Sequence, residues 1–343
     1  MPDQPTVKTP QCDALSRFVS LADLRAQLDL RCQFGGGYAV DHGAAPGGEV
    51  VFHLVLGGQC LVELEAGERV VLAAGDFLAL PRGTPHRVRS MTAPDAPPGA
   101  APEAAPVAPP DTSPDTSPDT SPGAQAAFTR HDGGLLPVRR NTDGPAELDL
   151  LCGRFSTGSR ATDALLATLP GALHASLGQA RPCAELRAIV ALIRDEVESA
   201  EQGALAIVAG LARVLFTLAL RVQLAGGKGA PGVLALLGDA RLAAAAQAML
   251  ASPGEDWSMG QLAGLAALSR ATFMRRFGEV AGTTPGEFLT LLRIARAAQL
   301  LRRTQRGTGD IGMEVGYRSE SAFNKAFARA MGASPAAFRR GAA

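Results

Sequence analysis

The chain has 343 residues, with 33 Lys and Arg against 33 Asp and Glu, so its net charge is zero when histidine is neutral. This length predicts two domains, and five cysteines without framework spacing exclude a secreted disulfide scaffold. The most apolar long run, residues 203–220, is interrupted by Arg213, so we expect a buried or dimerising helix there rather than a membrane span. We expect the protein to be cytoplasmic, where thiols stay reduced.

Residues 50–90 are predicted to form a small β-barrel or sandwich. They contain short apolar runs separated by glycine turns at 57–58, 67 and 75–76. Within them, GDFLALPRGTPH (75–86) resembles the second conserved motif of the cupins, which ends in an inward histidine. The resemblance implies a cupin-like barrel.

The usual cupin metal site looks incomplete in this sequence. The first cupin motif normally supplies two histidines and a glutamate, but here only His53 is recognisable, and Val55 stands where the second histidine would be. His53 and His86 are therefore candidates for an effector pocket, for a metal site shared with a cysteine, or for hydrogen-bonded core residues. Two nitrogens without a third evident ligand make a poor zinc site, so no metal and no other cofactor is expected.

A low-complexity segment interrupts the barrel. Residues 93–127 are dominated by Ala, Pro and a triple DTSP repeat, a composition that cannot bury a core. We expect residues 92–135 to be a mostly disordered insertion and the barrel to resume with a returning strand at Glu147–Phe155. Two helices are predicted next, at about 184–200 and 203–224. The expected domains are 1–225 and 238–340, with a linker at 226–237.

Two consecutive patterns in the last hundred residues are typical of helix-turn-helix units. The first runs from Trp257 to Val280 and the second from Gly307 to Gly332. In each, a serine at an N-cap position, Ser269 or Ser319, precedes a helix whose apolar residues recur three to four positions apart. Gly316 is expected to supply the tight turn of the second unit. A helix held in this way is the element that enters a DNA major groove.

Residues 285–303 join the two units and are predicted to form one amphipathic helix, with Pro285 in its first turn. Nineteen helical residues span roughly 28 Å, which suits two reading helices set about one duplex turn apart, ~34 Å.

The distribution of charge agrees with a DNA-binding C-terminal domain. Residues 241–343 contain fourteen Lys and Arg against seven Asp and Glu, a net charge of +7, and residues 1–240 carry −7. A basic domain is the electrostatic footprint of a polyanion binder.

Residues 235–340 resemble the AraC/XylS family of bacterial transcription regulators. The matching segments are LAALSRATFMRRF, GTTPGEFL, VGYRSESAFNKAF and GASPAAFRR. The resemblance implies double-stranded promoter DNA and RNA polymerase as partners, and a homodimer formed through the helical pair. Where the family usually places a polar cap and an aliphatic residue, this chain has Gly307, Thr308 and Gly309. We therefore expect the first helix of the second unit to start late or to fray.

Exposed residues at the start of each second helix are the candidate DNA contacts. Arginine pairs with guanine and asparagine with adenine, whereas other cations position the protein on phosphates. The candidates of the first unit are Arg270, Ala271, Thr272 and Arg275, and those of the second are Ser319, Glu320, Ser321, Asn324 and Lys325, with Arg276, Arg318 and Arg329 as phosphate contacts.

Segments of the N-terminal half resemble cupin-type AraC regulators, including members that sense reactive chlorine species. These segments are CDALSRFVSLADL, FHLVL, LALPRGTPHRV, HDGG and LLCGRF. The resemblance implies cysteine oxidation as the input, with Cys32 and Cys152 as the candidate sensors. Arg31 is expected to stabilise a thiolate at Cys32, the reactive form, although both cysteines also suit the core. Cys60 and Cys183 are expected to be structural, and Cys12 to lie in a loose terminus.

The sequence thus predicts an α+β protein with an N-terminal cupin-like β-barrel, a helical pair and a C-terminal all-α double helix-turn-helix domain. The predicted function is sequence-specific transcription regulation, controlled in the barrel by cysteine oxidation or by a small-molecule or metal effector at His53 and His86. The competing class is a cupin enzyme with an accessory helical tail. The incomplete first metal motif and the two DNA-reading units favour the regulator, so no catalytic residue is expected.

Overall fold

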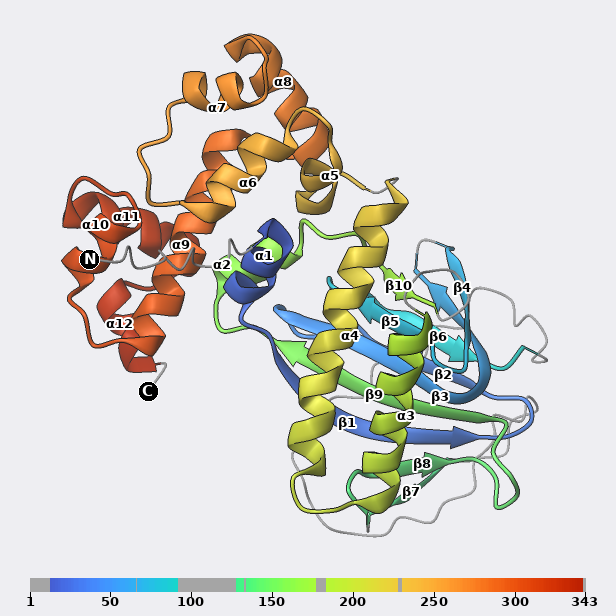
Figure 1. The fold of residues 1–343 in the computed structure, drawn as a ribbon. Helices are drawn as coiled ribbons and strands as arrows, with labels where there is room; N and C mark the ends of the chain where they lie inside the picture. Colours follow the sequence, from blue (N-terminus) through green and yellow to red (C-terminus); the bar gives the residue numbers. More distant parts are fainter. Residues whose placement is uncertain are drawn as a thin grey trace, which may run out of the picture.

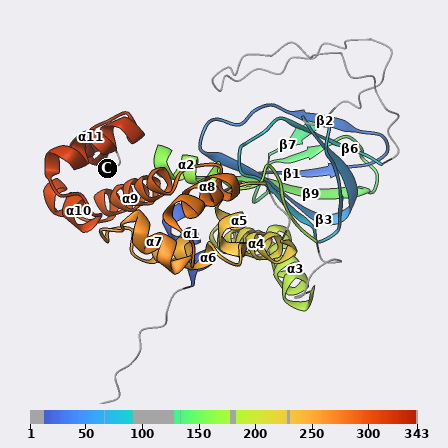
Figure 2. The ribbon, with the colours of Figure 1, turned by 90° about the horizontal axis from the view of Figure 1, so that it is seen from above.

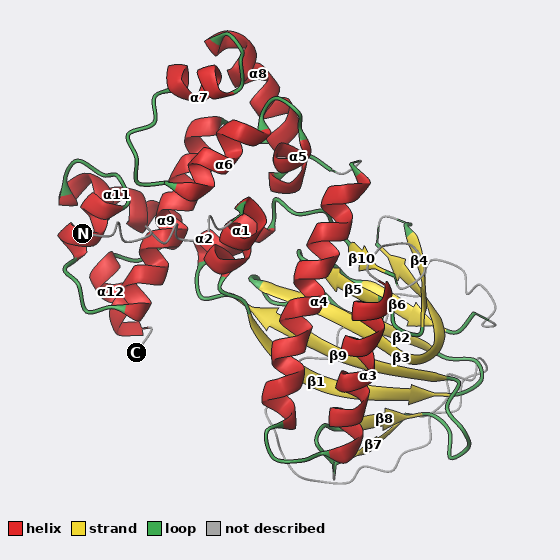
Figure 3. Cartoon of the chain, viewed as in Figure 1, coloured by secondary structure: helices red, strands yellow, loops and turns green. Residues whose placement is uncertain are grey.

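The computed structural model describes residues 13–65, 67–91, 128–132, 134–176, 183–227 and 230–341. Its strands gather on one side of the molecule and most of its helices on the other, as the red and yellow elements of Figure 3 show. The strands form a curled sheet that two long helices cover, and the helices of the C-terminal part stand beside it (Figure 1). The predicted α+β architecture is confirmed.

The barrel is built around one long, bent strand, β3 (Glu49–Leu64). The first half of β3 pairs with β5 and β9, and the second half pairs with β4 and β6. A register shift between Val55 and Gly57 marks the bend. The other strands are β1 (Arg25–Phe34), β2 (Ala39–His42), β4 (Arg69–Ala73), β5 (Phe77–Leu80), β6 (His86–Arg89), β7 (Thr129–His131), β8 (Val138–Arg140), β9 (Leu148–Ser156) and β10 (Leu173–Ala175).

Successive side chains of each strand point to opposite faces, so the barrel residues contribute to two separate hydrophobic cores. One face of the sheet packs under helix α4 (Ala204–Gly226), where the ring centroids of Phe155 and Phe216 lie 5.2 Å apart. The other face closes on itself around Cys32, Cys60 and Cys152. Helix α3 (Cys183–Ser199) packs beside α4. By length and composition α4 is the one helix of the described residues apolar enough to cross a membrane, but its buried residues cover the sheet.

The C-terminal part is an array of eight helices in the described chain. They are α5 (Val233–Gly238), α6 (Ala243–Ala251), α7 (Met259–Leu265), α8 (Arg270–Ala281), α9 (Pro285–Arg303), α10 (Thr308–Glu314), α11 (Glu320–Met331) and α12 (Pro335–Gly341). Helix α9 has the predicted bounds, and residues at its N-terminus explain where it begins. Thr284 and Glu287 form a capping box around Pro285 at the first turn.

The late start expected for the second unit is not found, because α10 begins at Thr308. Its N-cap, Gly307, offers no side-chain hydrogen bond. Tertiary contacts replace the cap. The Thr308 hydroxyl donates to Glu320 of α11 at 2.8 Å, and Gly312 lies so close to Phe323 that a Cβ at this position would sit 2.9 Å from that side chain.

Two short helices outside the expected pattern connect the barrel to the C-terminal array. Helix α1 (Ala14–Ala22) precedes the barrel in sequence, yet it packs on α6 and α9, and α2 (Arg160–Leu166) packs on α9. Asp23, at the end of α1, accepts hydrogen bonds from Arg302 and Arg303 of α9. Figure 1 shows the α1 and α2 ribbons between α9 and the sheet, and Figure 2 shows α2 between α9 and the barrel.

One segment within the predicted insertion forms a strand. Residues 92–127 lie outside the described residues, whereas residues 129–131, also within the predicted insertion, form β7. This strand pairs with β8, which runs parallel to β1, so sheet pairing orders it.

Gly153 lets β9 pass close to its neighbours. A Cβ at this position would lie 2.6 Å from the backbone oxygen of Gln27 and 2.5 Å from the ring of Phe52. We expect Gly153→Ala to destabilise the protein by ~1–3 kcal/mol because backbone and ring must move apart. Urea denaturation of the full chain measures this change. Gly43→Ala is the matched control, since its Cβ would meet nothing within 4 Å, and an equal loss in both variants would contradict the packing argument.

Candidate DNA interface and ligand site

Helices α8 and α11 each stand on a buried pair of phenylalanines. Phe273 and Phe277 anchor α8, and Phe323 and Phe327 anchor α11, with the two rings of each pair 5.6 Å apart. Serine N-caps stabilise the N-termini of both helices. Ser269 accepts a hydrogen bond from the backbone N–H of Thr272, and Ser319 accepts one from that of Ala322. The predicted N-caps are confirmed, and the opposite face of each helix is turned to solvent.

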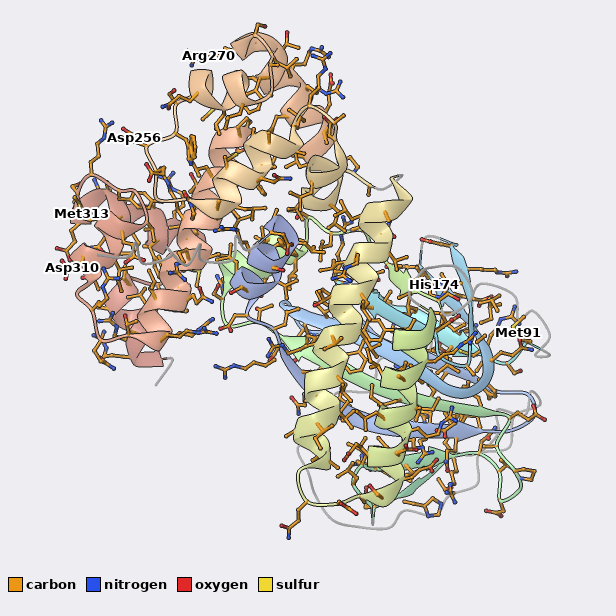
Figure 4. All side chains as sticks on the ribbon, viewed as in Figure 1. Met91, His174, Asp256, Arg270, Asp310 and Met313 are labelled. Atoms are coloured by element: carbon orange, nitrogen blue, oxygen red, sulfur yellow. The ribbon has the colours of Figure 1, made fainter. Side chains whose placement is uncertain are left out.

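In the first unit, Arg270, Ala271 and Arg275 are exposed. Arg270 projects from the outer end of the array in Figure 4. Arg275 forms an exposed pair with Glu279 at 2.7 Å, which solvent weakens and a nucleic acid can displace. Thr272 is half-buried, and its hydroxyl lies 2.9 Å from that of Ser269, so this side chain also serves the cap.

In the second unit, most of the candidates are equally accessible. Ser321, Lys325 and Arg329 are exposed, as are Ser319 and Glu320 at the start of the helix, while Asn324 is half-buried. Glu320 already accepts the Thr308 hydrogen bond. The roles of all these residues in DNA recognition stay predictions.

Two of the expected phosphate contacts carry ion pairs within the protein. Arg276 donates to Asp239 at 2.8 Å, which fixes α8 to the segment before α6. Arg318 pairs with Asp256 at 2.6 Å, but both side chains are more than four-fifths exposed. Arg318 is therefore free to exchange partners, whereas Arg276 would have to leave a structural contact to reach a phosphate.

Inside the barrel, a hydrogen-bonded chain joins the sensing candidates. The Cys152 sulfur lies 3.2 Å from His53 Nδ1, His53 Nε2 lies 2.7 Å from His86 Nε2, and His86 Nδ1 lies 3.0 Å from the Thr84 carbonyl oxygen. A carbonyl only accepts, so His86 carries its proton on Nδ1 when neutral. His53 then donates from Nε2, and its Nδ1 accepts from the Cys152 thiol. Cys32 lies diagonally opposite Cys152, because Cys152 pairs with Leu30 and Cys32 pairs with Leu150 in the β1–β9 ladder.

His42 joins this cluster, although no motif had predicted a role for it. Strand β2 pairs with β6 so that His42 lies opposite His86, and the two rings stack with centroids 4.6 Å apart. The candidate ligand atoms of His42, His53 and His86 all lie within 4.8 Å of one another. His42 is therefore a third candidate ligand that was not evident from the motifs.

Burial keeps the cluster uncharged. It lowers the pKa of His42 to about 4 and also lowers the pKa values of His53 and His86. The pKa of the Cys152 thiol is raised well above its usual range, first by its hydrogen bond with Cys32 and then by burial. At neutral pH the histidines are neutral imidazoles and Cys152 is a thiol.

The expected role of Arg31 is wrong. Neighbouring residues of a strand point to opposite faces, so Cys32 faces the core at 3 % exposure while Arg31 faces outward. There Arg31 pairs with Asp149 at 2.5 Å and with Glu198 at 3.6 Å. Cys60 is a buried thiol whose pKa is raised to about 12 by burial. Cys12 and the side chain of Cys183 lie outside the described residues.

Comparisons with known proteins cover both parts of the chain. A cupin family model matches residues 13–225, and a helix-turn-helix domain model matches residues 262–341. An uncharacterised HTH-type transcriptional regulator of Haemophilus influenzae is 31% identical over 96% of this chain and 98% of its own. The RCS-specific HTH-type transcriptional activator RclR of Escherichia coli is 28% identical over 95% of this chain and 97% of its own.

Among solved structures, an AraC-type transcriptional regulator from Chromobacterium violaceum is 29% identical. The match covers 30% of this chain and 92% of that one, with a TM-score of 0.29.

Proposed function

Because this chain belongs to the AraC family of transcription regulators, with a cupin domain ahead of its helix-turn-helix domain, we propose that its DNA binding is controlled by a signal received inside the barrel. The chain is a DNA-binding regulator and not a cupin enzyme. The observation that carries the proposal is the cluster of Cys32, Cys152, His42, His53 and His86 inside the barrel.

Oxidation of the cysteine pair is the first candidate signal. Cys32 and Cys152 are diagonal neighbours on the paired strands β1 and β9, and the similarity to the RCS-specific activator RclR supports hypochlorous acid as the oxidant. In the first step the Cys32 thiol takes up chlorine from hypochlorous acid, giving a sulfenyl chloride and water. The Cys152 sulfur then displaces chloride, forming a disulfide and releasing a proton. Oxidation thereby removes the donor that Cys152 offers to His53.

A small molecule or metal ion bound by the histidines is the second candidate signal. His42 is only half-buried, in contrast to His53 and His86, so it forms the solvent side of the cluster. The three imidazoles are neutral and offer ring nitrogens to a ligand. This candidate needs no change in the oxidation state of any cysteine.

Strand β1 offers a route from the cluster to the DNA-binding helices. It carries Cys32 and begins at Arg25, two residues after Asp23. Asp23 pairs with Arg302 at 2.9 Å and with Arg303, both in the last turn of α9, and Gln299 donates to the Ser20 carbonyl at 3.0 Å. A shift of β1 would therefore act directly on α9, the helix that joins the two helix-turn-helix units. Such a local movement would change the balance between two arrangements of the DNA-binding helices.

Target mapping tests the proposed function directly. We expect full-length protein to bind discrete promoter sites in cells, to act there together with RNA polymerase in the cytoplasm, and to change occupancy or transcription when the cells meet hypochlorous acid. Genome-wide mapping of bound sites with and without oxidant measures both effects. Binding without sequence preference would refute the regulator proposal, and unchanged occupancy and transcription would refute the oxidant as its signal.

A homodimer through α3 and α4 is part of the proposal. Leu192 of α3 and Leu205, Ile207 and Val214 of α4 are all more than two-fifths exposed, and Ile207 and Val214 lie seven residues apart on one helical face. We expect Ile207→Glu combined with Val214→Glu to raise the dimer dissociation constant at least about tenfold, which sedimentation velocity would detect. Val71→Glu, on exposed strand β4, is the matched control. A wild-type protein that sediments as a monomer at micromolar concentration would contradict this interface.

A further inference from the structure

Three histidines from three different strands converge at one end of the barrel interior. His42 ends β2, His53 lies within the long strand β3, and His86 begins β6. Their candidate ligand atoms lie within 4.8 Å of one another, and those of His53 and His86 are only 2.7 Å apart. Zn–N bonds of ~2.0–2.1 Å in a tetrahedral site would place the ligand nitrogens about 3.3 Å apart. Side-chain adjustments of about one ångström would therefore suffice to seat an ion.

The groups around the imidazoles orient them as metal ligands are usually oriented. Histidine ligands commonly donate their second ring nitrogen to a carbonyl or carboxylate, which fixes the tautomer and the ring direction. His86 does this with the Thr84 carbonyl, so its Nε2 has a free lone pair. The second nitrogen of His53 meets the Cys152 sulfur. His53 presents Nε2 to an ion after its proton moves to Nδ1, and the hydrogen bond to Cys152 then reverses.

From this geometry we propose that His42, His53 and His86 bind one divalent transition-metal ion of the zinc type, with Cys152 positioning His53 and the fourth coordination position open. Imidazole ligands suit zinc, copper, nickel and iron, whereas magnesium and calcium prefer oxygen. The donor set differs from the usual cupin one. Strand β2 supplies the third histidine, His42, whereas Val55 stands where the first cupin motif would supply its second histidine. The proposal deepens the second candidate signal, and it stands or falls independently of DNA binding.

Cobalt titration of the untagged, metal-free full chain tests the site. Co²⁺ reports tetrahedral nitrogen coordination by its visible absorption, and metal analysis after gel filtration gives the zinc stoichiometry. We expect one Zn²⁺ or Co²⁺ per chain and no competition from Mg²⁺. His42→Ala, at the half-exposed position, should weaken Co²⁺ binding at least about 100-fold. His131→Ala is the matched control, because His131 is exposed on β7, and it should bind as wild type does.

A gain-of-signal variant keeps the test decisive if a loss variant misfolds. His42→Cys places a thiolate in the same ligand position and should add a sulfur-to-cobalt charge-transfer band in the near ultraviolet while the stoichiometry stays at one. Absence of bound metal in the wild type, equal loss in His42→Ala and His131→Ala, or a His42→Cys spectrum without the new band would each overturn the proposal. DNA binding measured on the same samples separates this failure from a failure of the regulator function.

Discussion

Arg275→Ala is expected to cost ~1–3 kcal/mol in binding to one half of the operator, about a 5- to 150-fold loss of affinity. Arg275 lies on the exposed face of α8, and its one ion pair in the described structure, with Glu279, is itself exposed. We expect Arg275 to pair with guanine through two hydrogen bonds, and alanine would remove both. Preference at the base pairs of that half-element should relax, while preference in the other half stays unchanged.

Variants in the second unit make this prediction specific. Lys325→Ala should relax preference in the other half-element, because Lys325 occupies the exposed face of α11. Arg329→Ala should weaken binding to all sequences alike and reduce the salt dependence by about one phosphate contact. Binding titrations of the full chain on selected and scrambled duplexes, at several salt concentrations, measure all three changes. Equal loss on both duplexes for Arg275→Ala would show that this arginine contacts phosphate instead of a base.

The C-terminal elements were predictable because their signals are local. Thr284, Pro285 and Glu287 encode the start of α9 within four residues, and the serine caps encode the starts of α8 and α11. Gly316 has the positive φ of +91° that the predicted tight turn requires. Local signals fail where tertiary contacts replace them, as at Thr308, whose helix begins without a side-chain cap because α11 holds it.

The barrel cluster was only partly predictable because it depends on long-range pairing. His53 and His86 follow from the cupin resemblance, but the contribution of His42 depends on β2 pairing with β6, which no periodicity in the short segment AVDH encodes. The contact of α1 with α9 is equally long-range, although the cap at Asp13, which accepts from the Ser16 backbone N–H, was a local sign of a helix. The misassigned role of Arg31 came from adjacency in sequence, which in a strand separates side chains.

Cys32→Ser is expected to abolish the response of the regulator to hypochlorous acid. If oxidation forms a disulfide between Cys32 and Cys152, Cys152→Ser must abolish the response as well, because the sulfenyl chloride then has no neighbouring thiol to capture it. Both variants should keep the DNA affinity of the reduced protein within about threefold, or ~0.7 kcal/mol, since neither residue lies in the C-terminal array. DNA binding before and after oxidation, and after treatment with a thiol reductant, measures the response.

The pair of variants separates three mechanisms that a single variant would confuse. Loss in both variants indicates the disulfide, whereas loss in Cys32→Ser alone indicates a stable sulfenic acid at Cys32. Retention in both would exclude the thiols and leave the histidine cluster as the input. Cys60→Ser is the control because Cys60 is buried in the same core but lies on β3, outside the paired strands β1 and β9 that carry Cys32 and Cys152. A disulfide across β1 and β9 would draw these strands together. Because β1 follows directly after Asp23, which pairs with α9, this movement would reach the DNA-binding helices. Asp23→Asn should therefore uncouple DNA binding from oxidation, while the disulfide itself still forms.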